Sequence, residues 1–419
     1  MAERAASGSA AIDRERLLAD LRALVRIPSI TGSEDAVSAW AATALREAGL
    51  SVEALAPDPA VIRADPDWTG EEMPRTTLPI VIGRAGRPGG RRIVLSGHLD
   101  VVPPGDPATW TVDPWAGEVR GGRLYGRGAC DMKGGVAAIL AAVRALDAAG
   151  HLDDLAGEVV VALVPSEEDG GQGTLAAIRA GVAGDLSVIT EPSNLDVVVA
   201  HAGAITFRLT VPGRAVHASQ RREGVSALDK LFVLVQALEA DEARRNAAET
   251  DPLMTALGLP YPTIVGIVQG GEWASTVLDR VVADGRYGVR LGQTPAGAET
   301  ELREAIASAC AADEFLRDHP ATVEITGGRF GSARVPSDHA LPVGLADVIE
   351  AETGRRPALL GEPYGADMRL FVDAGTPCVI FGPGDVRVAH SADEFVPLDE
   401  VETCARVLAT WIRRELITG

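Results

Sequence analysis

Histidine and acidic residues follow several apolar runs of this 419-residue sequence, at the points where those runs end. The run RRIVL, for example, is followed by His98 and Asp100. Residues of the same kind at other run ends are Asp131 in YGRGACDMKGG, Glu167 and Glu168 after VVVALVP, Glu191 after LSVIT, and His390 in CVIFGPGDVRVAH. Imidazole nitrogens and carboxylate oxygens are ligands that Zn²⁺ accepts. Each residue alone is typical of a helix cap or a solvated loop, but their joint occurrence predicts a metal site.

The adjacent carboxylates Glu167 and Glu168 are the most informative members of this set. Two neighbouring carboxylates that face one buried site repel each other unless positive charge lies nearby, and a metal cluster supplies that charge. One of them can then bind the metal while the other accepts a proton from bound water as a general base. Taken alone, the stretch SEEDGGQG favours the simpler interpretation of a solvated acidic loop.

Apolar strands that alternate with helical patterns must position these residues. Strands are predicted at 77–83, 91–100, 157–169 and 185–193, and helices at 12–25, at 33–50 with Ser33 as the N-cap, at 132–150 and at 174–181. This order predicts an α/β fold with a doubly wound, mainly parallel sheet covered by helices on both faces. Ligands of such sheets bind beyond the carboxyl ends of the strands, which is where the polar residues lie.

A different pattern begins near His201 and indicates an inserted domain. Strands are predicted at 203–213, 262–271, 280–292 and 321–328, with helices at 226–245 and 298–316, which is the β-α-β-β-α-β order of a ferredoxin-like α+β domain. We therefore expect residues 1–202 and 330–419 to form one catalytic domain and residues 203–329 to form an inserted lid and dimerisation domain.

The composition excludes some classes of partner. The chain has 39 Lys and Arg against 59 Asp and Glu, a net charge of −20, which disfavours binding to nucleic acid and to anionic membranes. The four cysteines show no C-x-x-C spacing and are expected to be buried thiols in a reducing cytoplasm. The N-terminal residues contain no apolar stretch of signal-peptide length, which favours the same location.

The glycine-rich stretch GGRLYGRGACDMKGG does not match a phosphate-binding loop. Lys133 is followed by glycine instead of Ser or Thr, and neither nucleotide-binding fingerprint has its required spacing after a strand. We expect the glycines to allow close backbone approach around Asp131.

The motifs together resemble a known family, the dinuclear zinc exopeptidases and amidohydrolases that include acetylornithine deacetylase, succinyl-diaminopimelate desuccinylase, aminoacylase and carboxypeptidase G. The matching stretches are SGHLDVVP, GRGACDMKGG, PSEEDGGQG, TEPS, GRAVHAS, YGADMRLF and FGPGDVRVAHSADEFV, in the family's order. The resemblance covers nearly the whole chain from His98 to Val396.

The resemblance implies roles for the residues at the strand ends. Asp131 would bridge two Zn²⁺ ions per subunit, with Co²⁺ or Mn²⁺ as possible substitutes. His98 and Glu191 would complete one metal site, and Glu168 and His390 the other. Glu167 would be the general base and acid, acting on a hydroxide shared by the metals. Asp100 would hydrogen-bond the His98 ring and fix its tautomer.

The same resemblance implies two further features. His217 would cross the interface of a homodimer formed by the inserted domain and stabilise the oxyanion in the partner subunit's site. The peptide bond between Asp131 and Met132 would be cis, as in other family members. The other histidines, His151, His201, His319 and His339, lack such a context and are expected to be structural.

The sequence also departs from the family. Many relatives carry Asn and Pro where this chain has Ser275 and Leu278, which weakens an assignment to the desuccinylases. Arg286 and Arg369 are candidates for binding the substrate carboxylate, and Arg286 is equally consistent with a surface position on a strand. Gly365 and Asp367 are expected to shape the floor of the pocket.

Three functions follow as hypotheses. The leading one is hydrolysis of the amide bond of an N-acyl amino acid, as in acetylornithine deacetylase. The alternative is a dipeptidase or carboxypeptidase that uses the same metal site on a small peptide. A non-catalytic binding module is the remote alternative, since loss of function should erase such costly clustered charges and all the predicted ligands and Glu167 are present.

Overall fold

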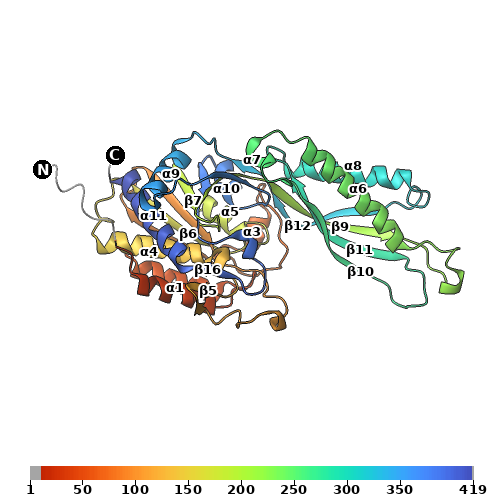
Figure 1. The fold of residues 1–419 in the computed structure, drawn as a ribbon, viewed down its shortest axis with the longest axis horizontal. Helices are drawn as coiled ribbons and strands as arrows, with labels where there is room; N and C mark the ends of the chain where they lie inside the picture. The colour runs from red at the N-terminus through yellow and green to blue at the C-terminus, as the bar shows by residue number, and fades with distance from the viewer. Residues whose placement is uncertain (1–10, 418–419) are drawn as a thin grey trace.

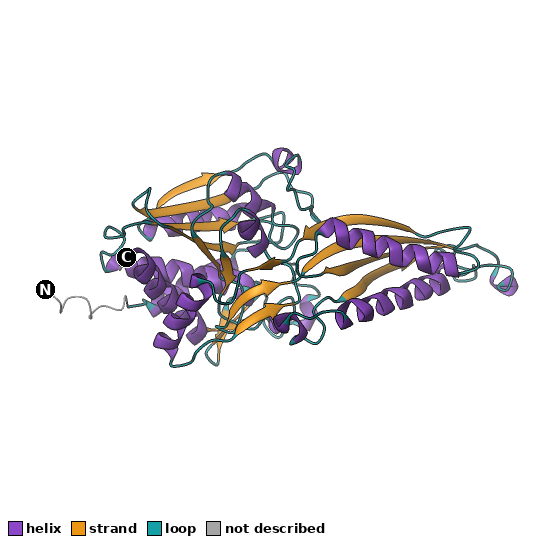
Figure 2. Ribbon diagram, turned by 90° about the horizontal axis from the view of Figure 1, so that it is seen from above, coloured by secondary structure: helices purple, strands orange, loops and turns teal. Residues whose placement is uncertain are grey.

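The computed structural model describes residues 11–417. These residues form two parts that meet end to end (Figure 1). A rounded part carries the large sheet and both ends of the described chain. An elongated part extends away from it and contains a second sheet with two long helices along it (Figure 2). We call them the catalytic part and the inserted part.

The large sheet has nine strands, in the order β1-β2-β6-β3-β7-β15-β8-β13 with β14 paired to β8. Its central strands β6, β3, β7 and β15 are parallel, and antiparallel strands flank them. The strands are β1 Ser51–Leu55, β2 Ile80–Gly86, β3 Arg92–His98, β6 Glu158–Val164, β7 Leu186–Ile189, β8 Val197–His201, β13 Ala333–Arg334, β14 Leu359–Glu362 and β15 Cys378–Ile380. The predicted α/β class with a mainly parallel centre is confirmed.

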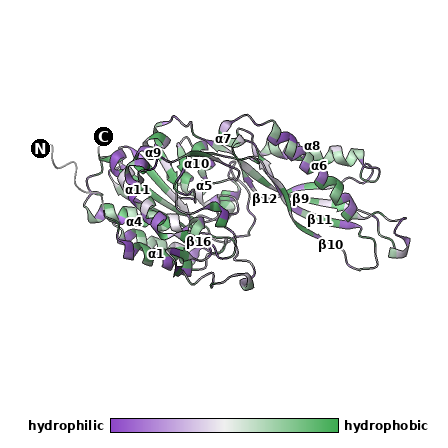
Figure 3. Ribbon diagram, in the orientation of Figure 1, coloured by the Kyte–Doolittle hydropathy of each residue, from purple (hydrophilic) through white to green (hydrophobic). Residues whose placement is uncertain are grey.

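Helices cover both faces of this sheet. Residues of α1, α2, α4, α9 and α11 share one hydrophobic core with strand residues such as Ile93 and Leu95, while α3, α5 and α10 share another core with Val94. The helices are α1 Arg14–Arg26, α2 Asp35–Glu47, α3 Pro59–Arg63, α4 Gly134–Ala148, α5 Gln172–Arg179, α9 Ala340–Thr353, α10 Met368–Asp373 and α11 Leu398–Leu416. Because successive side chains of β3 point to opposite faces, the uninterrupted apolar runs of the sequence supply both cores. The strands at the centre of the sheet are coloured as hydrophobic in Figure 3.

One predicted helix start is wrong. Ser33 was expected to cap α2, but the N-cap residue is Glu34, whose side chain makes no capping hydrogen bond. Its Oε1 instead accepts a hydrogen bond from the backbone N–H of Gly32 at 2.8 Å and lies 3.2 Å from Nη1 of Arg75. The Glu34 side chain thus pairs with Arg75 at the point where a local helix cap was expected.

The inserted part has the predicted β-α-β-β-α-β order. Its sheet runs β10-β11-β9-β12 and is antiparallel throughout, with α6 and α8 packed on it in a separate core. The elements are β9 Gly203–Pro212, α6 Ala227–Ala247, α7 Pro252–Thr255, β10 Thr263–Gly270, β11 Arg280–Val289, α8 Pro295–Ala312 and β12 Thr322–Phe330. These elements occupy residues 203–330, against the predicted insertion of 203–329.

A small third sheet joins the segment after His390 to the glycine-rich loop. Its strands are β4 Glu118–Arg120, β5 Arg123–Tyr125 and β16 Phe395–Pro397, in the order β16-β5-β4. It places the loop after His390 beside the loop before Asp131. Among residues 11–417, no helix is both long and apolar enough to cross a bilayer.

Candidate metal centre

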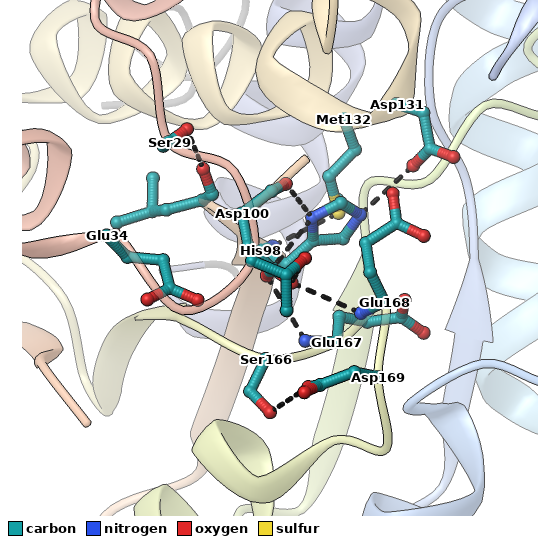
Figure 4. A network of polar contacts seen from close by, with 12 residues as sticks. Ser29, Glu34, His98, Asp100, Asp131, Met132, Ser166, Glu167, Glu168 and Asp169 are labelled. Atoms are coloured by element: carbon teal, nitrogen blue, oxygen red, sulfur yellow. Dashed lines mark hydrogen bonds and ion pairs between the residues drawn. The ribbon is translucent and has the colours of Figure 1, made fainter. Parts of the chain in front are cut away.

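The five predicted metal ligands converge at one edge of the large sheet. They come from separate elements: His98 is the last residue of β3, Asp131 lies between β5 and α4, Glu168 follows β6, Glu191 follows β7, and His390 follows β15. Figure 4 shows His98 and Asp131 facing each other, with Glu167 and Glu168 beside them. The parallel strands β3, β6, β7 and β15 end at the same edge, which is why residues 292 positions apart in the chain meet there.

The carboxylate of Asp131 lies between two imidazoles. Its Oδ1 is 3.0 Å from Nε2 of His98, and its Oδ2 is 3.3 Å from Nε2 of His390. The same His98 nitrogen lies 3.5 Å from Oε1 of Glu191, and the same His390 nitrogen lies 3.2 Å from Oε1 of Glu168. The side chains therefore form two groups that share Asp131, the grouping that the resemblance implied.

The donor set fits metal ions. His98 and Asp131 with Glu168, and His98 and Glu191 with Glu167, each offer ligand atoms that lie within 4.8 Å of one another. These groups contain one imidazole and several carboxylates, and His390 beside Asp131 and Glu168 adds a second nitrogen donor. Nitrogen and oxygen donors without a thiolate are accepted by Zn²⁺ and by other divalent transition metals.

The ionisation of the site is strongly perturbed. Burial opposes the charged form of His390, but the carboxylates of Asp131 and Glu168 raise its pKa to about 11. The pKa of His98 is likewise raised well above 6.5, because the charge of Glu191 and the bond to Asp131 outweigh burial. Burial raises the pKa of Glu191 to about 8. Without metal, protons on the imidazoles thus supply the positive charge that these carboxylates require.

Glu167 is placed to exchange protons in the cavity. Its side chain is 8% exposed and lines the same cavity as the ligands. Burial, followed by the charges of Asp367 and Glu191, raises the pKa of Glu167 well above its usual value. A buried carboxylate with raised basicity is suited to act as a general base and then as a general acid.

Asp100 differs from its predicted contact. Nδ1 of His98 is 2.8 Å from the backbone carbonyl oxygen of Asp100, whereas the carboxylate oxygen is 3.7 Å away. The carboxylate instead accepts hydrogen bonds from the backbone N–H groups of Glu167 at 3.1 Å and Glu168 at 3.3 Å, and from the Thr31 hydroxyl at 3.0 Å. The backbone of Asp100 therefore orients the imidazole, and its side chain holds the loop that carries Glu167 and Glu168 (Figure 4).

Backbone geometry marks two positions in the site. Ser166 and His390 both have positive φ angles, of 70° and 59°, which residues other than glycine rarely adopt. The predicted cis bond between Asp131 and Met132 is present.

Two buried clusters beside the site were not predicted. Glu394 accepts backbone N–H groups from Cys130 at 2.9 Å and Asp131 at 3.1 Å, and it pairs with Arg127 at 2.5 Å. Glu394 therefore holds the backbone at Asp131. The only hint in the sequence is its position four residues after His390.

The second cluster surrounds Arg75. Its guanidinium pairs with Glu34 at 3.2 Å and with Asp169 at 3.3 Å, and Asp169 accepts a 2.5 Å hydrogen bond from the Ser166 hydroxyl. These contacts join the start of the chain to the loop of Glu167. No local pattern indicated Arg75, because its partners are 41 and 94 residues away.

The ligands open into a cavity of about 530 Å³ between the two parts of the molecule. Residues of the inserted part line it together with four of the five predicted ligands, namely Asp131, Glu168, Glu191 and His390. Beside the ligands, the lining includes Glu72, Val102, Pro192, Ile264, Arg286, Phe330, Tyr364 and Gly365. The cavity thus combines apolar side chains with a few charged groups, as small-molecule sites commonly do.

The two candidate arginines have different surroundings. Arg286 lines the cavity and is 44% exposed at its side chain. Arg369 is 1% exposed, and its guanidinium donates to the carbonyl oxygens of Ala366 and Gly170, both at 2.8 Å, while it stacks on Phe330. That placement favours a packing role for Arg369 over contact with substrate.

His217 lies apart from the metal ligands of its own chain. It is exposed on the inserted part, where its backbone pairs with Thr276, and it is not among the described residues that line the cavity. Gly365 lines the cavity, while Asp367 is buried next to Arg369. The four cysteines are buried and unpaired, as expected.

Comparison with known proteins follows the motifs. Residues 94–414 match the model of peptidase family M20/M25/M40. A succinyl-diaminopimelate desuccinylase of Methylorubrum extorquens is 33% identical over 400 residues, which cover 92% of this chain and 95% of the relative.

Solved structures share the fold. Human carnosine dipeptidase 1 matches with a TM-score of 0.72 at 17% identity, over 95% of this chain and 96% of that one. A dinuclear metal-binding peptidase of family M20 from Bacillus subtilis matches with a TM-score of 0.62 at 15% identity, over 97% and 99%. At these identities the similarity shows that the fold is shared. It does not identify the substrate.

Proposed function

Because the chain belongs to peptidase family M20/M25/M40, we propose that it is a metal-dependent hydrolase that removes the acyl group from an N-acyl amino acid. The observation that carries the proposal is the grouping of the predicted ligands around Asp131, with Glu167 on the same cavity. Similarity to a desuccinylase supports an acyl substrate, since that relative is named for removing one. A family of amide-bond hydrolases and an intact donor set both argue against a non-catalytic module.

We propose that the centre takes two Zn²⁺ ions, with Co²⁺ or Mn²⁺ as substitutes. His98 and Glu191 would hold one ion, His390 and Glu168 the other, and Asp131 both. When bound, the ions would polarise the scissile carbonyl and lower the pKa of the attacking water.

Glu167 would move the proton in the reaction. Its carboxylate would accept a proton from the attacking water and deliver it to the amide nitrogen as the C–N bond breaks. The hydrogen bonds from the backbone of Glu167 and Glu168 to the Asp100 carboxylate would keep this side chain in place while its charge changes.

Arg286 would bind the carboxylate of the amino acid. A guanidinium at the cavity wall can make two parallel hydrogen bonds to a carboxylate, which favours substrates with a free α-carboxyl group. The proposed substrate is not restricted to N-succinyl compounds, because Ser275 and Leu278 replace the Asn and Pro of the desuccinylase pattern.

We further propose that the protein acts as a homodimer through the inserted part. The edge strand β10 and the adjacent loop carry exposed apolar side chains: Ile264, Ile267 and Val268 are 51–62% exposed and Trp273 is 75% exposed. An unpaired apolar edge strand is a surface that a second copy can cover. His217 lies beside this loop, so a partner subunit could receive it as the oxyanion donor.

We also propose a cytoplasmic location, with which the buried, unpaired thiols are consistent.

The test is a substrate panel on purified enzyme loaded with Zn²⁺ or Co²⁺. N-acetyl, N-succinyl and N-formyl amino acids are compared with dipeptides. Glu167→Gln should reduce hydrolysis by at least about 10³-fold and leave the metal content at the wild-type level, because Glu167 is assigned proton transfer and no ligand role. The matched control is Glu53→Gln, at an exposed position on β1. Hydrolysis of dipeptides alone would favour the dipeptidase alternative, and an active Glu167→Gln enzyme would refute the mechanism.

A further inference from the structure

Arg286 forms an ion pair with a residue from the other part of the molecule. Its Nη2 lies 3.1 Å from Oε1 of Glu72, which is 214 residues earlier in the chain. Arg286 is on β11 of the inserted part, whereas Glu72 is on the loop between α3 and β2 of the catalytic part. Both residues line the cavity, so the pair joins the two parts at its wall.

No acidic residue lies directly opposite Arg286 in the sheet of the inserted part. The residues opposite Arg286 are Thr206 on the neighbouring strand β9 and Ile264 on the neighbouring strand β10. Two positions along the same face of β11, Asp284 lies opposite Arg208 and forms two ion-pair contacts with it at 2.7 and 2.9 Å. Charge pairing within the sheet is therefore complete at Asp284, while the partner of Arg286 comes from outside the sheet.

Several contacts fix the position of Glu72. Its Oε1 also accepts a 2.7 Å hydrogen bond from the hydroxyl of Thr206. Its Cγ lies so close to Gly327 that a Cβ there would come within 2.6 Å. The backbone N–H of Arg329 donates to the carbonyl of Thr69 at 2.6 Å. The loop of Glu72 is thus docked on β12 and β9 by backbone and side-chain contacts together.

The same loop contacts the segment that carries the general base. The hydroxyl of Thr69 donates to the carbonyl oxygen of Gly170, three residues after Glu167. The carbonyl of Gly70 packs so closely on Gly170 that a Cβ there would lie 2.4 Å from it. Glu72 is therefore held between the inserted part and the loop that carries Glu167.

Stability does not account for the ion pair. The side chains of Glu72 and Arg286 are 33% and 44% exposed, and such pairs contribute little to the free energy of unfolding. A long arginine side chain instead loses conformational freedom when it binds a ligand, and a partner that restrains it beforehand reduces that cost. The guanidinium has other N–H groups with which to bind a carboxylate.

We propose that Glu72 is a positioning residue: it holds the guanidinium of Arg286 at the cavity wall, oriented to bind the α-carboxylate of the substrate. The inference rests on the proposed function, since it assigns that carboxylate to Arg286. It adds a residue of the catalytic part to a contact otherwise made by the inserted part, so that substrate binding depends on how the two parts are docked.

The experiment compares an N-acetyl amino acid with its α-carboxamide, which keeps the scissile amide and lacks the carboxylate. Metal-loaded wild type, Glu72→Gln, Arg286→Gln and the double variant are assayed by steady-state kinetics. Glu72→Gln should raise KM for the carboxylate substrate about three- to tenfold, with kcat changed less than about twofold and KM for the carboxamide unchanged. In the Arg286→Gln background, Glu72→Gln should have no further effect.

Asp284→Asn is the matched control, because it breaks an exposed ion pair on the same face of β11, away from the cavity, and should leave KM unchanged. Binding of the N-acetyl amino acid to Glu167→Gln enzyme, measured by calorimetry with Glu72 intact or replaced, gives a readout that does not need turnover.

Three results would overturn the assignment of Glu72. They are a lower KM in Glu72→Gln, equal increases for carboxylate and carboxamide, and an increase that persists without Arg286, as expected if Glu72 bound a substrate ammonium group. Failure of wild type to hydrolyse any member of the panel would refute the proposed function, and the calorimetric comparison would still decide the role of Glu72.

Discussion

At the scale of single residues, the site depends on groups that hold other groups. The His98 ring is oriented by a backbone carbonyl, and the carboxylate of the same residue, Asp100, is occupied with the loop of Glu167 and Glu168. On the other side, Glu394 holds the backbone of Asp131. Such contacts orient the predicted ligands for metal binding.

Replacing Asp100 by alanine separates its two contacts. The substitution keeps the backbone carbonyl that orients His98 and removes the acceptor for the Glu167 and Glu168 N–H groups. Affinity for metal should fall about 10- to 100-fold, with the fold retained, as measured by competition with a chelator. Asp106→Asn, at an exposed cap later in the same loop, is the control. Unchanged metal affinity in Asp100→Ala would contradict the role of this carboxylate.

Metal uptake should depend on pH in a definite direction. The raised pKa of His390, about 11, means that the metal-free protein holds a proton there at pH 7, so metal must displace it. Because fewer protons compete as the pH rises, apparent affinity should increase from pH 6 to pH 8, by about tenfold per unit for each proton released. Calorimetry in buffers of different ionisation enthalpy counts these protons.

His390→Gln should lower the proton count, whereas His319→Gln, at an exposed histidine of the inserted part, should leave it unchanged. Affinity that does not vary with pH would show that the imidazoles are already neutral without metal.

At the scale of elements, close approach between a helix and a strand end places the ligands. The N-terminal turn of α4 packs against the end of β7, where a Cβ on Gly135 would lie 2.0 Å from the carbonyl oxygen of Thr190. Thr190 directly precedes the ligand Glu191, and α4 directly follows the turn of Asp131. A glycine at this contact therefore allows Asp131 and Glu191, two of the predicted ligands, to lie close together.

Gly135→Ala tests this contact. The obstacle is backbone and cannot rotate away, so the substitution should lower the free energy of unfolding by about 2–3 kcal/mol and weaken metal binding. Gly344→Ala in α9 is the matched control, since its added Cβ would meet only a side-chain oxygen at 3.6 Å. There the substitution should be stabilising by up to about 1 kcal/mol. Chemical denaturation measures both, and equal effects would refute the packing argument.

At the scale of the whole molecule, the cavity lies where two separately built parts meet. The catalytic part carries the predicted metal ligands and Glu167, and the inserted part carries Arg286 and an exposed edge strand. His217 lies outside the cavity of its own chain. A homodimer would complete both the edge strand and the oxyanion site, which is the reason we connect quaternary structure to activity.

Ile267→Lys should test that connection. Ile267 is 52% exposed on the edge strand β10, and a lysine there would oppose pairing with a second copy. Sedimentation velocity should show a shift from dimer to monomer, with hydrolysis reduced at least about tenfold as His217 is lost from the partner's site. Val61→Lys, at a residue 65% exposed on the catalytic part, is the control. A monomeric variant with full activity would contradict the role of His217 in the partner.

Much of the architecture, and which residues gather around Asp131, could be predicted from the order of residues along the chain. Apolar runs with polar residues at their ends indicated the parallel centre, and the motifs indicated His98, Asp131, Glu167, Glu168, Glu191 and His390. Both signals are local, because strand ends and motif spacings are written in short stretches of sequence. The cis bond after Asp131 was predicted by the same resemblance.

Contacts between distant segments required the folded chain. Arg75, Glu394 and Glu72 gain their roles from partners 41 to 267 residues away. The residues next to Arg75 and Glu72 in the sequence do not distinguish them from solvated loop residues, and the position of Glu394 near His390 does not indicate its contacts. For the same reason the Asp100 carboxylate binds two backbone N–H groups instead of an imidazole. The cap expected at Ser33 is replaced by Glu34, whose side chain pairs with Arg75. The chemistry of the site is thus encoded locally, whereas the restraint of its groups arises from tertiary packing, since charge pairing and close backbone approach depend on separations in space.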